Sequence, residues 1–517
     1  MVKLQQHGAI TNVDSGIIPK LPTREQIQRD VLAHEVKIKE AERQLEELRE
    51  EGRKLKEHLN DSSPFLSLPV DVISEIFYHS YDWRYRYDYA RLPVQFVIGR
   101  TCRAWREIAW SQSRLWQDVT ISLADSRFDD QLRLLEKWLD RSAGRLISLT
   151  LNLHPDSVKK TWTPPPALYH TILQTCHRWK SVGIYDGMFD GLISTMNSCG
   201  VAFQFPELER LYTGESTQYF AEWPLNFPSQ LRELHLSVAE TLEFPNISVD
   251  WSQLTSLYVS CAVEPLLDVI RQCRSLVYLN FNCPDNTDDD DIDSQIVENP
   301  HNLPSLDRIS YLGESYWLSQ LMRNITAPNL QYLSSIMEPE EAIPGLWVAN
   351  AIRMVKRSNC KLKHFSIIVN FPSLSFVEQD FMDLLNALPY LEAINIDFGP
   401  TLTNRSIDLL TPETDSSSAA GVKSTVPNLR NFRFHGDVSF DPQNFVDMVE
   451  SRSRLIQASS TADASSKADI SVPKRLELDI HCHNRHWLDG KSPTEADTFY
   501  DHLRSFSSNV VVNIDGP

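Results

Sequence analysis

A six-residue phrase recurs over most of the chain and restricts the folds that the chain can adopt. In each copy a leucine or tryptophan is followed by two variable residues, an apolar residue, one variable residue and another apolar residue. Apolar residues that alternate in this way are typical of a short strand with one buried face. Complete copies begin at Leu146, Trp179, Leu231, Leu254, Leu276, Leu306, Leu362, Leu391 and Leu429, and weaker copies begin at Leu208 and Leu330. One copy cannot bury its apolar face alone, so the copies predict stacked strands, with helices between them, in a solenoid over residues 140–517.

A different periodicity, in alternating steps of four and three residues, marks residues 27–59. This 3.5-residue spacing is the seam of a coiled coil, and Glu, Lys and Arg fill its flanks. The seam consists of Ile27, Val31, His34, Ile38, Ala41, Leu45, Leu48, Gly52, Leu55 and Leu59. We expect a helix over residues 23–60 that forms a homodimer through residues 27–59, docks as a single charged helix on the next domain, or is only marginally stable alone. Residues 1–22 show no periodicity and are predicted to be disordered.

Residues 62–120 are predicted to form a compact helical domain. Leu68 and Pro69 precede its first helix, and proline is suited to a helix start because no backbone hydrogen bond is lost there. The apolar residues of that helix are Val72, Ile73, Ile76 and Phe77, and a second motif contains Val97, Cys102 and Trp105, followed by Leu115 and Trp116. These side chains form the core of a small domain, the anchors of an interface, or both, because so small a unit has few purely internal positions.

The Leu-Pro pair before a helix, the Cys-Arg-Ala-Trp-Arg motif at Cys102–Arg106 and the later Leu-Trp pair resemble the F-box family. The phrase beyond residue 140 resembles leucine-rich repeats of the irregular intracellular kind, and the whole layout is similar to the expanded F-box families of mushroom-forming fungi. The resemblance implies an α/β chain with three parts. These are a coiled-coil-like N-terminal helix, a small all-α F-box domain, and a leucine-rich-repeat solenoid with a curved parallel sheet and outer helices.

By this resemblance the chain is a non-catalytic substrate-recognition subunit of an SCF-type ubiquitin ligase. Its F-box would bind a Skp-type adaptor and, through it, a cullin-RING scaffold. The implied adaptor-binding residues are Leu68, Pro69, Val72, Ile73 and Ile76, completed or supported by Val97, Cys102, Trp105, Leu115 and Trp116. The alternative is a leucine-rich-repeat interaction scaffold whose F-box-like fold does not join a ligase.

A protein substrate of the solenoid would lie along the exposed face of the sheet. The residue between the two apolar strand positions of each phrase points to that face. This column consists of His235, Tyr258, Asn280, Ser310, Ser334, Ser366, Asn395 and Arg433. Recognition of phosphate needs clustered basic residues, and only Arg433, with His235 when protonated, supplies positive charge. We therefore expect recognition by shape and hydrogen bonding; the other interpretation is an ordinary solvated sheet face.

Composition argues against several other functions. The net charge of −19 disfavours nucleic acids and acidic membrane surfaces, which attract clustered Lys and Arg. Eight scattered cysteines without a CxxC pair, together with an N-terminus that lacks an apolar signal segment, favour reduced thiols and a cytoplasmic or nuclear location. No catalytic motif, cofactor fingerprint or membrane span is apparent. The densest set of possible metal ligands, His481, Cys482, His483 and His486, lacks the two separated ligand pairs of a zinc site, so no metal is expected.

Overall fold

The computed structural model divides the chain into two compact units, residues 1–112 and residues 113–517. The structure describes residues 23–80, 93–159, 161–200, 203–216, 230–238, 249–283, 300–337, 346–369, 376–412, 425–463, 475–482, 501–503 and 510–515. The predictions for residues 1–22, for His483 and for His486 lie outside these residues.

The first unit is helical. It contains the helices α1 (Arg24–Asp61), α2 (Val70–His79), α3 (Val94–Thr101) and α4 (Arg103–Ser111), with a 3-10 turn over Pro64–Ser67. The long helix α1 coincides with the predicted heptad segment, and its apolar seam is exposed, including Ile38, Leu45 and Leu48. Arg43 forms ion pairs with Glu40 and Glu47 on the solvated flank of the helix.

An aromatic cluster forms the centre of the three short helices. The Trp105 ring lies 4.8 Å from the Phe65 ring and 5.1 Å from the Phe77 ring, measured between centroids. Phe77 is buried, as are Ile73 of α2 and Ala109 of α4. Aromatic pairs at these separations add to the burial of apolar area, so this small core holds α2 against α4.

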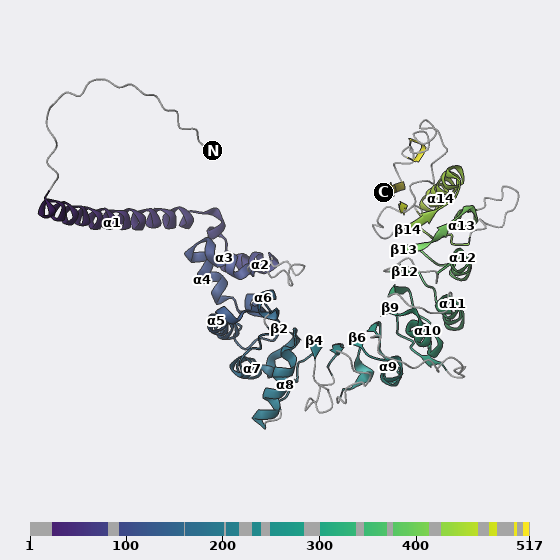
Figure 1. Ribbon diagram of the computed structural model, residues 1–517, viewed down its shortest axis with the longest axis horizontal. Helices are drawn as coiled ribbons and strands as arrows, with labels where there is room; N and C mark the ends of the chain where they lie inside the picture. The colour runs from purple at the N-terminus through teal and green to yellow at the C-terminus, as the bar shows by residue number, and fades with distance from the viewer. Residues whose placement is uncertain are drawn as a thin grey trace, which may run out of the picture. The chain divides into compact units, whose positions relative to one another are not determined.

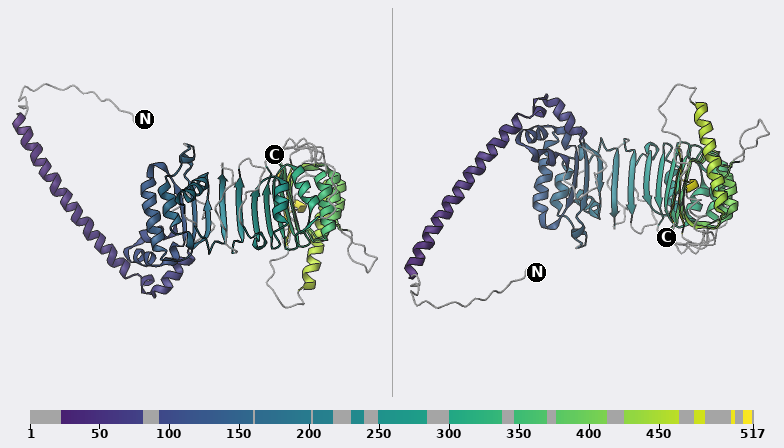
Figure 2. Two further views of the ribbon diagram at one scale, coloured as in Figure 1. Left: turned by 90° about the horizontal axis from the view of Figure 1, so that it is seen from below. Right: turned by 90° about the horizontal axis from the view of Figure 1, so that it is seen from above.

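The second unit is a repeat solenoid. Its described residues form one parallel sheet of fourteen strands with helices along one of its faces, which confirms the predicted parallel α/β architecture. The sheet consists, in spatial order, of β1 (Asp118–Leu123), β2 (Ile147–Leu153), β3 (Trp179–Ile184), β4 (Arg210–Ser216), β5 (Glu233–Val238), β6 (Ser256–Ser260), β7 (Tyr278–Asn282), β9 (Arg308–Gly313), β11 (Tyr332–Met337), β12 (His364–Val369), β13 (Ala393–Leu402), β14 (Asn431–Val438), β15 (Leu476–Cys482) and β16 (Val510–Asp515). A separate pair is formed by β8 (His301–Asn302) and β10 (Ile325–Thr326). Within this unit the strands line the inner side of an arc (Figure 1), and Figure 2 shows them side by side.

The helices of the second unit lie on the outer side of the arc (Figure 1). They are α5 (Phe128–Arg141), α6 (Pro155–Val158), α7 (Pro166–Leu173), α8 (Met188–Cys199), α9 (Val263–Ile270), α10 (Ser315–Asn324), α11 (Leu346–Ser358), α12 (Glu378–Ala387), α13 (Asn404–Leu410) and α14 (Pro442–Asp463). The apolar positions of the phrase form the core between the two layers, and Leu234, Leu257 and Leu279 are fully buried in adjacent repeats. Period-2 alternation therefore places one face of every repeat against the helices and leaves the other face on the inner side of the arc.

The sheet begins earlier than residue 140, where we predicted its start. Its first strand, β1, follows Trp116, and Trp116, Val119 and Ile121 occupy the three apolar positions of the phrase. Tryptophan replaces leucine at the first position here, as Trp179 does in the copy that enters β3. The prediction that Leu115 and Trp116 belong to the helical domain is therefore wrong, because both residues are buried where the chain enters β1.

Buried or half-buried arginines satisfy backbone carbonyls between the repeats. Arg357 of α11 donates through Nη2 to the carbonyl oxygens of Met322 and Ile325, and Arg452 of α14 donates through Nη1 to those of Val426 and Leu429. Burial lowers the pKa of Arg452 to about 10. Backbone carbonyls that are buried need a donor, so these side chains act where regular repeats would supply a repeated polar residue.

Candidate functional site

The first candidate site is an apolar surface on the helices of the first unit. Along α2, Val72 is 43% exposed and Ile76 is 42% exposed, whereas Ile73 and Phe77 are 1% and 2% exposed. One face of α2 therefore exposes Val72 and Ile76 to solvent, and the adjacent face buries Ile73 and Phe77 in the core. Pro69 is exposed at the N-cap of α2, where its carbonyl oxygen accepts hydrogen bonds from the amides of Val72 and Ile73.

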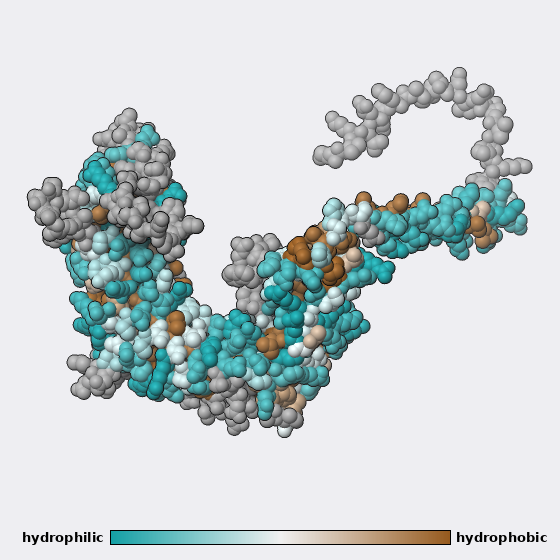
Figure 3. Space-filling view, turned by 180° about the vertical axis from the view of Figure 1, so that it is seen from behind, coloured by the Kyte–Doolittle hydropathy of each residue, from teal (hydrophilic) through white to brown (hydrophobic). Residues whose placement is uncertain are grey.

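The structure sorts the remaining predicted adaptor-binding residues into three classes. Leu68 and Val97 are exposed, like Val72 and Ile76. Cys102 and Trp105 are half-buried, and the Cys102 sulfur caps α4 by accepting a hydrogen bond from the Trp105 amide at 3.5 Å. Figure 3 shows apolar side chains gathered over the short helices of this unit.

Leu115 and Trp116 form the third class, because both are buried in the second unit. The Trp116 ring packs edge-on against Trp138 at 5.8 Å between centroids, and the Arg141 guanidinium lies 4.8 Å from its ring. Trp116 has no exposed surface for a partner, so its role is packing in the first repeat. Sequence reasoning missed two exposed residues of the short helices, Val70 of α2 and Trp110 of α4. Their helical spacing from the named residues was the available signal.

The second candidate site lies on the inner face of the sheet. Parallel pairing aligns the eight predicted substrate-contacting residues in one row that runs across the strands from β5 to β14. The row is formed, in spatial order, by His235, Tyr258, Asn280, Ser310, Ser334, Ser366, Asn395 and Arg433, all of them half-buried or exposed. The register extends the same row to Tyr212 of β4 at one end and to Asp479 of β15 at the other.

Side chains in continuous contact cross seven strands of this face, and we call them the aromatic ladder. The ladder consists of Tyr212, His235, Tyr258, Tyr278, Arg308, Tyr332 and His364. Tyr332 and His364 stack with centroids 4.3 Å apart and planes inclined by 6°. The Arg308 guanidinium lies between two rings, 5.7 Å from the centroid of Tyr278 and 4.5 Å from that of Tyr332.

Four ladder members occupy the third position of the phrase, which also faces the inner side of the sheet. Tyr278, Arg308, Tyr332 and His364 are aligned by pairing in a row next to the predicted one. Sequence reasoning followed only the fifth position and so missed them. The signal was present, because residues two apart in a strand point the same way.

Burial sets the protonation of the ladder. It lowers the pKa of His235 and of His364, so both imidazoles are neutral at neutral pH. Burial, with smaller contributions from Tyr278 and Glu233, raises the pKa of Tyr258 to about 12. Arg308 therefore supplies the only positive charge within the ladder.

The far end of the row is polar and paired. Arg433 of β14 lies 3.0 Å from an Asp479 carboxylate oxygen, so the predicted cation of the column already has a partner. His481 contacts the same carboxylate at 3.2 Å, and His435 pairs with Asp397. Among the described residues, no three His, Cys, Asp or Glu side chains come together as metal ligands, and no helix is long and apolar enough to cross a membrane.

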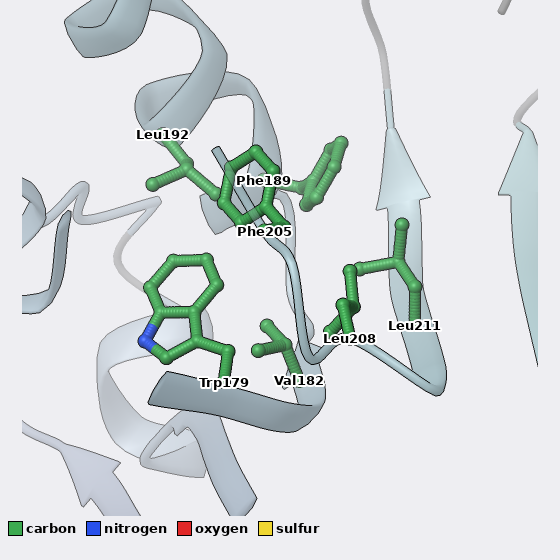
Figure 4. A pocket seen from close by; sticks show the side chains of 7 residues that line it. All are labelled: Trp179, Val182, Phe189, Leu192, Phe205, Leu208 and Leu211. Atoms are coloured by element: carbon green, nitrogen blue, oxygen red, sulfur yellow. The ribbon is translucent and has the colours of Figure 1, made fainter. Parts of the chain in front are cut away.

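A small cavity in the core offers no ligand site. Figure 4 shows it between β3, α8 and β4, and its volume is about 10 Å³. The lining is entirely apolar and consists of Trp179, Val182, Phe189, Leu192, Phe205, Leu208 and Leu211. A space of this size is at the lower limit for one water molecule, and it lacks polar partners for one. The two candidate surfaces described above are exposed or half-buried faces of the described residues.

Comparison with known proteins adds little. No family model matches the sequence, and no curated protein sequence matches it. A protein from Bacteroides fragilis, solved by the Northeast Structural Genomics Consortium, is similar to this chain at 15% identity and a TM-score of 0.29. The similarity covers 59% of this chain and 72% of that protein. At that identity and TM-score the likeness informs neither the function nor the details of the fold.

Proposed function

We propose that the chain is a substrate-recognition subunit of an SCF-type ubiquitin ligase. In this proposal the helices α2 to α4 are an F-box that binds a Skp-type adaptor, and the solenoid is an irregular leucine-rich-repeat domain that binds the protein to be ubiquitinated. The chain would contribute no catalytic residue of its own. The cullin-RING scaffold, reached through the adaptor, would carry the chemistry, and the location would be cytoplasmic or nuclear.

The observation that carries the proposal is the exposed apolar surface at the start of α2. Leu68, Val72 and Ile76 remain exposed in the presence of α1, which belongs to the same compact unit. Exposed apolar clusters on a small domain are typical of interfaces, because their burial by a partner releases water from apolar area. A surface covered by α1 would have favoured the alternative, a repeat scaffold that joins no ligase.

The test is complex formation with a purified Skp-type adaptor, followed by size-exclusion chromatography and calorimetry on the full chain. We expect a stoichiometric complex of sub-micromolar affinity, equivalent to more than about 8 kcal/mol. The variant Val72→Asp/Ile76→Asp should lose the complex, because two charges would be buried in the apolar centre of the interface.

The matched control is Val277→Asp, which places the same charge at an exposed valine of the solenoid. This control should bind the adaptor like the unchanged chain. Absence of a complex from a folded chain, or a complex that survives the double substitution, would contradict the proposal. The alternative scaffold would then be the better description, with the sheet face as its binding surface.

A further inference from the structure

We propose that the aromatic ladder binds an acidic, proline-rich segment of a partner protein in the polyproline II conformation. The inference rests on the proposed function in that this partner would be the substrate of the ligase, but the binding itself needs no adaptor. The reasons are the spacing of the tyrosines, the chemistry of the three rows around them, and the state of Arg308.

The four tyrosines form two pairs with one strand between the members of each pair, whereas Tyr258 and Tyr278, which belong to different pairs, lie on the adjacent strands β6 and β7. Tyr212 and Tyr258 lie on β4 and β6, with β5 between them, and Tyr278 and Tyr332 lie on β7 and β11, with β9 between them. Neighbouring strands are about 4.7–4.9 Å apart, so the members of each pair are separated by about 9.4–9.8 Å along the sheet.

A polyproline II helix has a matching repeat. It has three residues per turn and rises about 3.1 Å per residue, so equivalent side chains recur about every 9.3 Å. An α-helix repeats every 5.4 Å, and an extended strand repeats about every 6.8 Å, and neither agrees with the tyrosine spacing. A proline-rich segment that crosses the strands therefore places equivalent side chains, one turn apart, on the two tyrosines of one pair, such as Tyr278 and Tyr332. Aromatic surfaces are how such segments are bound elsewhere.

The rows around the ladder suit a ligand that crosses the strands. On β9, β11 and β12, the short side chains of Ser310, Ser334 and Ser366 separate two rows of larger ones. The row on one side contains Arg308 and Tyr332, and the row on the other is aliphatic and half-exposed, with Ile336 as its central member. Both flanking rows run perpendicular to the strands. A ligand therefore stays in contact with the apolar side chains of a row only if it also lies perpendicular to the strands.

Arg308 supplies the charge that selects an acidic ligand. It is exposed, and within the described part of the chain its side chain stacks on Tyr278 and Tyr332 without an ion pair to a carboxylate. Stacking holds the guanidinium plane while its N–H groups remain available at the edge. A carboxylate of the ligand would bind there in a bidentate manner. Glu233 on β5 disfavours acidic residues at the other end of the ladder.

The test uses fluorescent decapeptides and fluorescence anisotropy with the full chain. The first peptide has a central glutamate among prolines, the second has alanine in place of every proline, and the third has glutamine in place of glutamate. We expect the proline peptide to bind at least about tenfold more tightly than the alanine peptide. Tyr332→Ala should weaken this binding about tenfold, the loss typical of an interface tyrosine.

Arg308→Gln should weaken binding of the glutamate peptide and leave the glutamine peptide unchanged. The control is Tyr390→Ala, because Tyr390 is an exposed tyrosine between α12 and β13, away from the ladder. Equal binding of the proline and alanine peptides, equal loss in Tyr332→Ala and Tyr390→Ala, or displacement by a single-stranded RNA oligomer would overturn the proposal. No saturable binding up to about 1 mM would do so as well. The assay contains no adaptor, so its result is independent of the test of the ligase proposal.

Discussion

Two adjacent residues of α2 should differ sharply in their effect on stability. Phe77 is buried in the aromatic cluster, with its ring centroid 5.1 Å from that of Trp105 and 6.0 Å from that of Phe65. Its replacement by alanine removes these contacts and leaves a cavity, at a cost of about 3–5 kcal/mol. The neighbouring Ile76 is only partly buried, and alanine is the better helix former, so Ile76→Ala should cost about 1 kcal/mol or less.

The assay is hydrogen exchange of the full chain followed by mass spectrometry of peptides from residues 64–111. Each 1.4 kcal/mol is a factor of ten. Phe77→Ala should therefore accelerate exchange in α2 and α4 by about a hundredfold to several thousandfold, or to the unfolded rate if this small domain is only marginally stable. Ile76→Ala should change it by less than about tenfold. Peptides from the solenoid should be unaffected in both variants.

The reverse order of the two effects would refute the assignment of Phe77 to the core and of Ile76 to the surface. Equal effects would show that α2 contributes both side chains to one core, and the apolar surface would then not be available to an adaptor. The same comparison decides whether a loss of adaptor binding in an Ile76 variant reflects the interface or unfolding.

Three further predictions follow from single contacts. Trp116→Ala should destabilise the solenoid by about 3–5 kcal/mol in calorimetry and leave the adaptor affinity unchanged. If a folded Trp116→Ala variant bound the adaptor less tightly, Trp116 would belong to the adaptor-binding surface after all. Leu45→Glu/Leu48→Glu should convert a dimer into a monomer in sedimentation velocity, because both substitutions place charge in the seam of α1; identical sedimentation of the two chains would exclude pairing through α1. Glu378 accepts hydrogen bonds from the amide and hydroxyl of Thr403 and from the Ser406 hydroxyl, so Glu378→Ala should cost about 1–3 kcal/mol. Burial alone would raise the pKa of Glu378, but these hydrogen bonds lower it overall. The stability that Glu378 contributes is therefore present above its unfolded pKa of about 4.3 and disappears as the pH falls through the lowered folded pKa. A destabilisation by Glu378→Ala that is still the same at about pH 3 would contradict this prediction.

The solenoid could be predicted from the sequence because its signal is local. Every complete copy of the phrase coincides with a strand, and the weaker copies at Leu208 and Leu330 enter β4 and β11. The strand β15 was not found as a copy, since Arg475 stands where the phrase requires a large apolar residue. The start of the sheet was misplaced for a related reason. Trp116 serves the solenoid, although its Leu-Trp context suggested the helical domain.

The binding surfaces were only partly predictable, because exposure depends on what packs nearby. Helical spacing identified Val72, Ile73 and Ile76 together, but only burial in the folded unit separates Ile73 from the other two. The aromatic ladder was harder to predict than the apolar surface of α2. Its contacts, such as that of Tyr258 with Tyr278, join the fifth position of one phrase to the third position of the next. Their meeting requires the register, and the register is fixed by pairing between strands that are more than twenty residues apart in sequence.

Both candidate surfaces follow from one physical principle: a helix or strand buries the side chains of one face in the core and exposes those of the other face to solvent. In the sheet, Leu257 is buried while its neighbour Tyr258 is half-buried on the inner side, and β7 and β9 show the same alternation. Substitutions at exposed positions usually change stability by less than about 0.5 kcal/mol, so a residue such as Arg308 can vary while the core stays fixed. In α2 the separation is weaker, because a small domain has few internal positions and its surface residues are themselves apolar. A receptor needs this combination, a variable face for the substrate and a constant apolar face for the adaptor, and a general scaffold needs only the first. The exposed start of α2 therefore weighs more in favour of the ligase proposal than the repeats do.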